Sequence, residues 1–418
     1  MPRLLCAILL LQTAALPLGT DLVVDRDGEL VVSMTLECDA VDWAKEGAES
    51  AVVAVFIDGL HHHDVVLHSP RLEHAFVTGP LAKGTHRLRV DVDHASSPIE
   101  DAEVDLVDCA SEPVGTRRWL LYAPVLYGRP TRPGRKPLNA TSDTPLVMYA
   151  TEAAVAGGGV EYTYEAIWSN EDGGTGTMPA LLKAKYGRTT DIEWVFRVRL
   201  DAAGRVEEET YQAAGHGTKR FTGERVGLHP VLQVTTDNNN LAQVEEGSEP
   251  EGVLRFAFAP ALWDDAGPRE RVMDAQPWTY RVANAEMMRE RGLLGPKASV
   301  GDARDDLLVE ADLEAPSGTK WRFGAKVAGA WHWSDRGLAL GEVEGSGWVR
   351  TAIPLPPGTP ADAVQAVRVR AVGLSGEARV RSVRAFRLGR DFWPQPAIVD
   401  EAPDASLTPD RREWTRSR

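Results

Sequence analysis

The sequence predicts an all-β protein made of several β-sandwich domains. Short Val-rich runs with alternating polarity recur along the chain, Gly, Pro and Asp separate them, and a single stretch, Ala283–Gly295, has a convincing helical pattern. At 418 residues the chain is too long for one compact β domain, and about two to four domains are expected. The composition, 43% hydrophobic and 26% charged, is typical of globular proteins.

The first twenty residues, MPRLLCAILLLQTAALPLGT, predict a secretory signal peptide over residues 1–20. One basic residue, Arg3, precedes an apolar segment, Leu4–Leu11, and small residues follow it. The apolar segment is too short to span a membrane, and no later one approaches the roughly 18 continuous apolar residues that a spanning helix needs. We expect a secreted or periplasmic/extracellular protein with no transmembrane segment.

Export makes the cysteines informative. If Cys6 leaves with the signal peptide, Cys38 and Cys109 remain, one near each end of the first predicted domain. An oxidising compartment favours a disulfide between these two residues, and the alternative is a pair of buried free thiols.

The charge balance excludes one class of partner. The formal net charge is −15, and no basic run is interleaved with aromatic residues. A field of this sign repels nucleic acid and anionic membrane surfaces. We therefore expect no nucleic-acid partner.

Residues 21–111 predict an immunoglobulin-like β-sandwich. The runs SAVVAVFIDG and HDVVLHS alternate as strands do, and Gly79–Val90 is typical of a turn that leads into a late strand of such modules. The run HHHD, His61–Asp64, has the composition of a metal site. Three adjacent His side chains cannot all point one way from a strand, so we expect a solvated loop.

Two further domains and a tail complete the predicted organisation. Residues 118–300 predict a central β-sandwich with long, decorated loops. Residues 301–393 alternate strongly and predict a jelly-roll-like sandwich. Residues 394–418 are rich in Pro, Asp and Arg and predict a flexible tail.

The central domain carries the strongest cluster of chemically useful residues. Asp191 and Glu193 are two apart on a predicted strand, so their Cα atoms are roughly 6.5 Å apart and their side chains share a face. Two such carboxylates can converge on one divalent cation. The alternative is a solvated ladder of ion pairs, because Arg197 and Arg199 continue the same alternation.

Several central segments together resemble a known family. The order of YAPVLYGRP, TPLVMYA, YTYEAIWSNEDGG, GRTTDIEWVFRV, YQAAGHGT and LHPVLQV resembles the vacuolar protein sorting-associated protein 62 family and, more distantly, the necrosis-and-ethylene-inducing-like cytolysins. The residues that match the motifs of these families are Gly187, Asp191, Glu193, His216-Gly217, His229-Pro230 and, for the upstream acidic ligand of the cytolysins, Asp172.

The resemblance implies a cytolysin-like sandwich that holds a divalent cation, Ca or Mg, and engages sphingolipid head groups. The implied metal ligands are Asp172, Asp191, Glu193 and His216. Three departures separate this chain from the motif: Arg188 and Thr190 stand where it has histidines, and Ile192 replaces its Trp.

A second candidate ligand site lies in the C-terminal domain. In AWHWSD, Trp331 and Trp333 share one strand face, and exposed indoles can stack on sugar rings or cations. The alternative is a buried pair in the sandwich core. His229, with the polar loop after it, is a further candidate ligand-binding residue.

These observations favour recognition of a glycan or glycolipid head group, with possible cation dependence. No common catalytic signature is present. Paired carboxylates leave no motif, so a carbohydrate-active hydrolase or lyase is the main alternative, and a structural envelope protein is the third. The carboxylates available for such an enzyme are Glu161, Glu165, Asp191 and Glu193.

Overall fold

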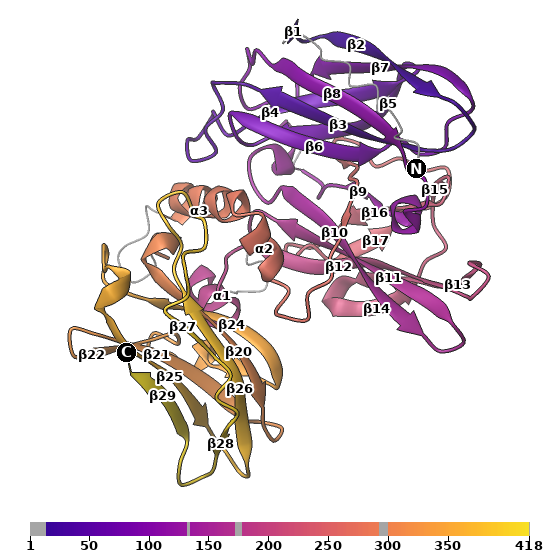
Figure 1. The fold of residues 1–418 in the computed structure, drawn as a ribbon. Helices are drawn as coiled ribbons and strands as arrows, with labels where there is room; N and C mark the ends of the chain where they lie inside the picture. Colours follow the sequence, from indigo (N-terminus) through magenta and orange to yellow (C-terminus); the bar gives the residue numbers. More distant parts are fainter. Residues whose placement is uncertain (1–13, 132–133, 172–177, 292–299, 418) are drawn as a thin grey trace, which may run out of the picture. The chain divides into compact units, whose positions relative to one another are not determined.

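The computed structural model describes residues 14–131, 134–171, 178–291 and 300–417 (Figure 1). It is a mostly β protein, as predicted, with four antiparallel sheets and one mixed sheet. The chain forms two compact units. The first comprises residues 1–174 and 191–264, and the second comprises residues 175–190 and 265–418.

The N-terminal part of the first unit is a sandwich of two four-stranded antiparallel sheets, in the orders β1-β8-β3-β6 and β2-β7-β4-β5. Residues 14–20, which fall within the predicted signal peptide, form β1 and begin β2. The strands are β1 Ala14–Ala15, β2 Leu18–Val24, β3 Leu30–Glu37, β4 Ala51–Ile57, β5 Leu60–Leu67, β6 Arg71–Val77, β7 Gly84–Val92 and β8 Asp105–Pro113.

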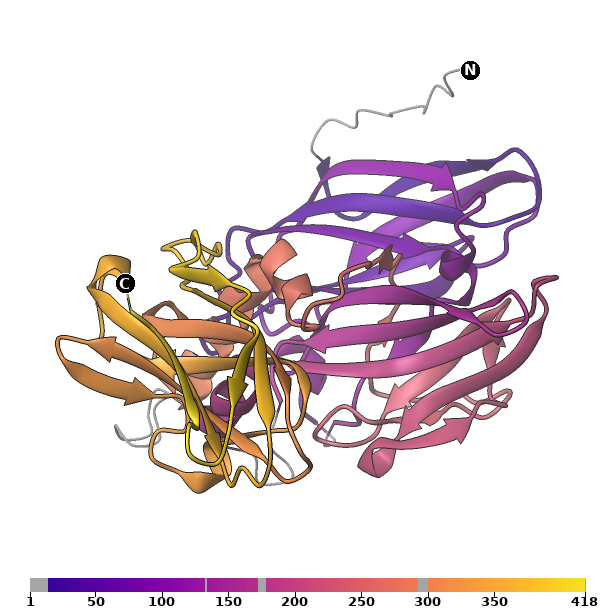
Figure 2. The same cartoon turned by 60° about the horizontal axis from the view of Figure 1, so that its bottom comes forward.

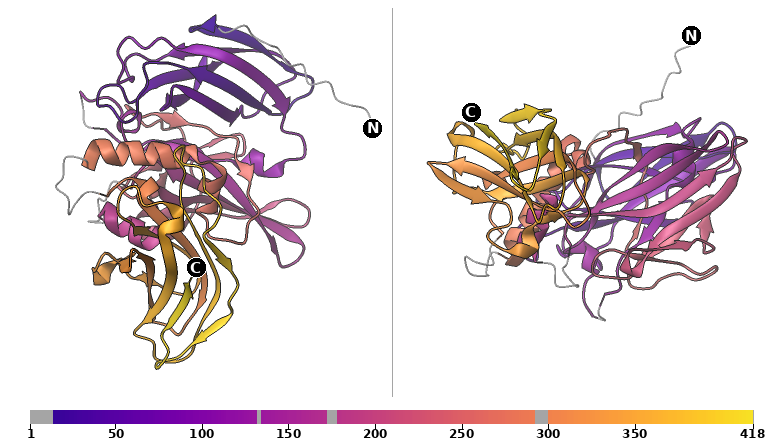
Figure 3. Two further views of the ribbon diagram at one scale, coloured as in Figure 1. Left: turned by 60° about the vertical axis from the view of Figure 1, so that its left-hand side comes forward. Right: turned by 90° about the horizontal axis from the view of Figure 1, so that it is seen from below.

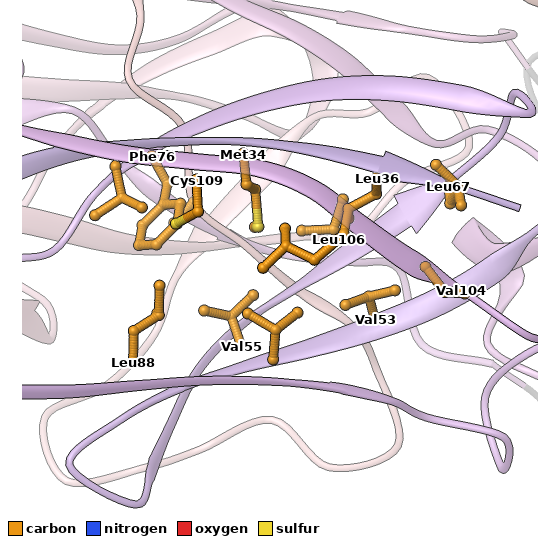
Figure 4. Close-up of a cluster of buried hydrophobic side chains, with 14 of the residues drawn as sticks. Met34, Leu36, Val53, Val55, Leu67, Phe76, Leu88, Val104, Leu106 and Cys109 are labelled. Atoms are coloured by element: carbon orange, nitrogen blue, oxygen red, sulfur yellow. The ribbon is translucent and has the colours of Figure 1, made fainter. Parts of the chain in front are cut away.

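The two sheets enclose an aliphatic core that also contains both cysteines (Figure 4). Cys109 lies beside Phe76 in this core, and Cys38 and Cys109 are free thiols. The predicted disulfide is therefore absent. In the strand ladder Cys109 of β8 is opposite Met34 of β3. Cys38 is four residues beyond Met34 along the chain, so its Cα atom lies roughly 13 Å from that of Met34. A disulfide needs Cα atoms within about 7 Å. Burial raises the pKa of the Cys109 thiol to about 11.

The central part of the first unit is one mixed sheet of eleven strands, whereas two stacked sheets were predicted. Three of its strand pairs are parallel: β9 with β16, β13 with β17, and β10 with β19. The strands are β9 Val125–Tyr127, β10 Pro145–Val155, β11 Gly159–Trp168, β12 Asp191–Leu200, β13 Val206–Ala213, β14 Gly217–Arg220, β15 Arg225–Val226, β16 His229–Val234, β17 Leu241–Gln243, β18 Arg255–Phe256 and β19 Ala261–Leu262.

The second unit contains a sandwich of two five-stranded sheets, β24-β20-β26-β27 with β28 and β22-β21-β25-β29 with β23 (Figure 2). The predicted flexible tail is wrong, because residues 394–418 supply β27, β28 and β29. The strands are β20 Asp306–Glu314, β21 Lys320–Val327, β22 Ala330–Trp333, β23 Val343–Glu344, β24 Gly347–Pro354, β25 Val364–Val372, β26 Ala378–Phe386, β27 Val399–Glu401, β28 Ala405–Leu407 and β29 Glu413–Ser417.

Three helices of the second unit lie beside its sandwich: α1 (Pro179–Tyr186), α2 (Arg271–Ala275) and α3 (Trp278–Arg291) (Figure 3). The predicted helix over residues 283–295 corresponds to α3, which begins five residues earlier; residues 292–295 lie outside the described residues. No helix in the described part of the chain is long and apolar enough to cross a membrane.

A buried ion network holds α2 and α3 on the sheet β24-β20-β26. Arg350 of β24 donates to Glu310 of β20 at 3.1 Å and to Asp274 of α2 at 2.6 Å. Tyr280 of α3 donates to the same Asp274 at 2.6 Å. Arg350 and Glu310 are fully buried, so the network covers the middle of this face, whereas Glu314 and Arg381 farther along it are exposed.

The HHHD run lies in β5 and not in a solvated loop. Asp58 and Gly59 have positive φ and form a tight hairpin turn, so β5 begins at Leu60. A bulge opposite β4 leaves His62 unpaired in the ladder, and its Nδ1 lies 2.8 Å from Nδ1 of His63.

These histidines continue into a chain of imidazoles in which His63 is buried and His62 and His74 are half-buried. His63 Nε2 lies 3.1 Å from His74 Nε2 on β6. Burial lowers the pKa of His62 to about 3 and that of His74 to about 4, and it holds the pKa of His63 well below the ordinary value. Charged Arg255 of β18 acts in the same direction on His62 and His63.

We predict that this chain makes the protein acid-sensitive. A His whose pKa is lowered by folding contributes stability above its unfolded pKa of about 6.5, and this stability is lost as pH falls toward the folded pKa. Charging His74 alone would cost on the order of 3 kcal/mol by pH 4. Urea unfolding at pH 7.5, 6, 5 and 4 should show a falling free energy of unfolding below pH 6.5.

The double substitution His62→Gln with His74→Gln removes two of these titrations and should flatten the profile between pH 6.5 and 4. His94→Gln, at an exposed histidine, is the matched control and should keep the wild-type slope. An unchanged slope in the double variant would contradict the assignment.

Candidate functional site

Asp191 and Glu193 lie on the same face of the central sheet as its aromatic core. Asp191 is opposite Trp168 of β11, and Phe196 is opposite Tyr164. These two β11 residues are an even number of positions apart and share one face. A β-bulge between residues 194 and 196 of β12 therefore puts the two carboxylates on the face that carries Phe196.

The arginines of β12 lie on the opposite face. Arg199 is opposite Glu161 of β11 and pairs with it at 2.9 Å, and Arg197 pairs with the same carboxylate at 3.4 Å. The predicted ladder of ion pairs exists, but the prediction that Asp191 and Glu193 share its face is wrong. The bulge reverses the alternation between the two pairs of residues.

The carboxylates belong to a set of polar side chains that we call the central polar cluster. Its centre is the amide of Asn239, whose Nδ2 lies 3.0 Å from Oδ1 of Asp143 and 3.1 Å from Oδ2 of Asp191. All three residues are buried. The cluster comprises Arg129, Asp143, Asp191, Glu193, Gln212, His216, Asn238, Asn239 and Asn240.

Glu193, which is half-buried, and His216, which is exposed, meet at the edge of the cluster. Gln212 of β13 donates to Glu193 at 2.6 Å and lies 2.7 Å from Nδ1 of His216. His216 Nδ1 is 3.7 Å from the Glu193 carboxylate. The structure thus brings three of the predicted metal ligands, Asp191, Glu193 and His216, into one network through amide side chains.

Backbone strain and unpaired acceptors mark this cluster. Asp143, His216 and Asn239 have backbone φ angles of 50°, 58° and 53°, a region that residues other than glycine rarely adopt. Among the described residues, the buried Oδ1 of Asn239 and Oε1 of Gln212 lack hydrogen-bond partners. Features of this kind concentrate at functional sites.

The described residues do not by themselves fit the predicted cation. Between Asp143 and Asp191, where a cation would be held by oxygens at about 2.0–2.6 Å, lies the amide nitrogen of Asn239. In the described part of the chain, no three His, Cys, Asp or Glu residues are grouped to hold a metal ion. Asp172, the fourth predicted ligand, lies outside the described residues.

Sequence reasoning missed Asp143, Gln212 and Asn239, which make most of the contacts in the cluster. The run Asp237-Asn238-Asn239-Asn240 was visible only as a polar loop. Asn and Asp tolerate positive φ better than other residues with side chains, which is the one signal that such a run offers.

The carboxylates available for an enzyme are divided between the two faces of the central sheet. Glu165 is opposite Trp194 of β12, on the face that also carries Glu161, and it accepts a hydrogen bond from Tyr149 at 2.7 Å. Asp191 and Glu193 lie on the other face. Because a sheet separates the two pairs, a carboxylate of one pair and a carboxylate of the other cannot flank one glycosidic bond.

His229 is buried and engaged at both ring nitrogens. Its Nδ1 lies 2.8 Å from the carbonyl oxygen of Ala123, and its Nε2 lies 3.0 Å from Glu29 of the N-terminal sandwich. The predicted ligand-binding role is corrected accordingly. His229 instead joins the mixed sheet to the loop before β3.

Trp331 and Trp333 lie outside the core of the C-terminal sandwich. Trp321 and Phe323 of β21 point into that core, so Gly324 points away from it. Trp333 is opposite Gly324, and both indoles are half-buried on the outer face. The alternative of a buried core pair is therefore wrong.

The two indoles form one surface over β21. Their ring centroids are 5.8 Å apart at 30°, and they rest where Gly324 has no side chain: a Cβ there would be 3.0 Å from Trp333. The Arg368 guanidinium carbon lies 4.1 Å from the Trp331 centroid, and that of Arg322 lies 4.9 Å from the Trp333 centroid. We call this surface the indole face. Its further members are Lys320 and Lys326 of β21, Arg370 of β25, and Glu413 and Thr415 of β29.

Comparisons with known proteins place the chain in no family. No protein-family model matches it, and no curated protein does. The resemblance of the central segments to the vacuolar protein sorting-associated protein 62 family therefore stays a prediction.

Some solved structures match parts of the chain weakly. The EclA C-terminal domain, described as a sugar-binding protein, is 10% identical, with 24% of this chain and 77% of that chain covered, at a TM-score of 0.19. A family two carbohydrate esterase from Clostridium thermocellum in complex with cellohexaose is 12% identical, with 26% and 32% covered, at 0.15.

A Clostridium perfringens ZmpB structure, which contains a catalytic domain with the CBM51-1 and CBM51-2 domains, is 9% identical, with 82% and 31% covered, at a TM-score of 0.16. TM-scores this low carry no conclusion about the fold or the function of this chain.

We predict that Asn239→Asp destabilises the protein by about 3 kcal/mol at pH 7, the usual cost of leaving a buried charge uncompensated. The variant puts a third carboxylate beside Asp143 and Asp191 and removes the amide donor that joins them. Urea unfolding in EDTA measures the loss. Asn238→Asp, with the same charge change at a half-buried neighbour, should lose less than about 1 kcal/mol.

Melts of the wild type in calcium, magnesium and EDTA complete this test. A cation at one hundred times its dissociation constant would add about 2.7 kcal/mol. We expect equal melting temperatures, because Asn239 already joins the carboxylates. A rise in calcium that Asp191→Asn abolishes would show a cation site and contradict the amide-linked network.

Proposed function

We propose that this protein is an exported glycan-binding protein and that the indole face of the C-terminal sandwich is its binding surface. The observation that carries the proposal is the stacked pair Trp331 and Trp333 on an outer sheet face, over a glycine that leaves room for both rings. Export rests on the apolar N-terminal segment, Leu4–Leu11.

The chemistry of the surface suits a sugar. Indoles combine a large apolar area with a polar N–H, so they pack against the C–H faces of a pyranose ring while its hydroxyls stay hydrated. The two half-buried indoles, on successive outward positions of β22, form one apolar strip, and the guanidinium groups of Arg368 and Arg322 lie over their rings. These guanidinium groups would donate hydrogen bonds to hydroxyl or acidic oxygens of a bound sugar.

The architecture supports the same assignment. The other outer face of this sandwich is covered in its middle by the Arg350 network and by α2 and α3. Rigid strands fix the indoles, and a ligand surface on strands is ordered before binding, which lowers the entropic cost of association. A hydrolase or lyase has less support, because the candidate carboxylates are divided between the two faces of the sheet and each already has a side-chain partner.

We predict that Trp331→Ala and Trp333→Ala each weaken glycan binding at least about tenfold, which corresponds to about 1.4 kcal/mol. The reason is the loss of one half of the apolar strip. Affinity electrophoresis in gels that contain hydroxyethylcellulose, xylan, polygalacturonate or dextran sulfate measures retention of each variant.

Two further variants control this experiment. Trp393→Ala removes an exposed indole elsewhere in the same unit and should leave retention unchanged. Gly324→Ala puts a methyl group in close contact with both indole rings and should displace them, so retention should weaken while the protein stays folded. Equal retention of wild type, Trp331→Ala and Trp333→Ala in every gel that retards the wild type would refute the indole face as the binding surface.

A further inference from the structure

We infer that the ligand of the indole face is an acidic glycan, one that carries uronate or sulfate groups. This inference rests on the proposed function, because it names the class of sugar that the same surface takes. It starts from the charges that the strand register brings to the face around Trp331 and Trp333.

The register puts five basic side chains on this face. Lys320, Arg322 and Lys326 alternate with the inward residues of β21, and Arg370 and Arg368 are opposite Arg322 and Gly324. Three carboxylates accompany them, with ion pairs of 3.1 Å, 2.7 Å and 3.0 Å to the nearest basic group: Glu344, Asp335 and Glu413.

These five basic groups and the three carboxylates paired with them leave two positive charges unmatched, on a chain whose formal net charge is −15. An uncompensated positive patch on an acidic protein attracts anions selectively, because the rest of the surface repels them. Nonspecific polyanion binding by the whole chain is disfavoured for the same reason.

Two positions supply the excess. Glu413 forms ion pairs with both Arg368, at 3.0 Å, and Arg370, at 3.4 Å, so two guanidinium groups share one carboxylate. Lys326 has no ion-pair partner among the residues that the structure describes, and it lies opposite Trp331 in the ladder. Each of these sites can take a further carboxylate or sulfate.

Glu413 also indicates how an acidic sugar would bind. Its two oxygens contact different arginines on neighbouring positions of β25, which is the bridging geometry available to a uronate carboxylate or a sulfate. The Trp331 ring lies under Arg368 at 4.1 Å. A sugar ring packed on the indoles would thus have its acidic group within reach of Arg368 or Lys326.

Titration of the full-length protein with polygalacturonate, dextran sulfate and neutral hydroxyethylcellulose tests the inference. We expect the wild type to bind at least one acidic polymer about tenfold more tightly than the neutral one, and its affinity should fall as salt rises. The two acidic polymers distinguish carboxylate from sulfate recognition.

Lys326→Gln and Arg368→Gln should each weaken binding of the acidic polymer about fivefold and reduce its salt dependence. Arg390→Gln, at an exposed arginine outside the face, is the matched control and should bind as the wild type does. Both active variants keep a polar side chain on the surface, and equal melting temperatures verify that they fold.

The outcomes separate this inference from the proposed function. Equal or tighter binding of hydroxyethylcellulose, weakened by Trp331→Ala but not by Lys326→Gln or Arg368→Gln, would leave the glycan-binding proposal standing and overturn the acidic class. Acidic-polymer binding that Trp331→Ala does not weaken would be charge attraction alone and would overturn both.

Discussion

The alternation of side chains across paired strands is the constraint on which both polar sites depend. Along β21 the alternation is unbroken from Trp321 to Gly324. Trp321 and Phe323 point into the core, and Gly324 faces outward beneath the indoles. Along β12 a single bulge reverses it, so that Asp191 joins the core face and Arg197 the opposite one. One extra residue in a strand therefore decides whether a carboxylate is buried in a network or exposed in an ion pair.

Local patterns in the sequence predicted much of the fold. Alternating Val-rich runs indicated the strands of both terminal sandwiches, and Asp58-Gly59 is a hairpin signal that fits the start of β5. The mixed central sheet was not predictable in this way, because its parallel pairs join strands far apart in the chain. The tail failed as a prediction because composition indicates disorder only where no sheet edge is available for pairing.

The central polar cluster and the indole face differ in how many of their residues could be predicted from the sequence. Trp331 and Trp333 are two apart on one strand, so their shared face followed from local spacing. Arg368 of β25 and Glu413 of β29 lie on the same face because β25 pairs with β21 and β29 pairs with β25. Local sequence patterns do not reveal this strand pairing. Likewise the predicted acidic pair was found in one cluster, but Asn239, which joins Asp191 to Asp143, comes from a loop about fifty residues away.

Hydroxyl-radical footprinting of the wild-type protein, with and without the polysaccharide that binds it most tightly, tests the central claim most directly. The account predicts that oxidation of Trp331 and Trp333 falls when the glycan is bound, while Trp393, more than half exposed in the same unit, reacts at an unchanged rate. Unchanged oxidation of Trp331 and Trp333 at saturating glycan, or protection confined to another part of the chain, would contradict it.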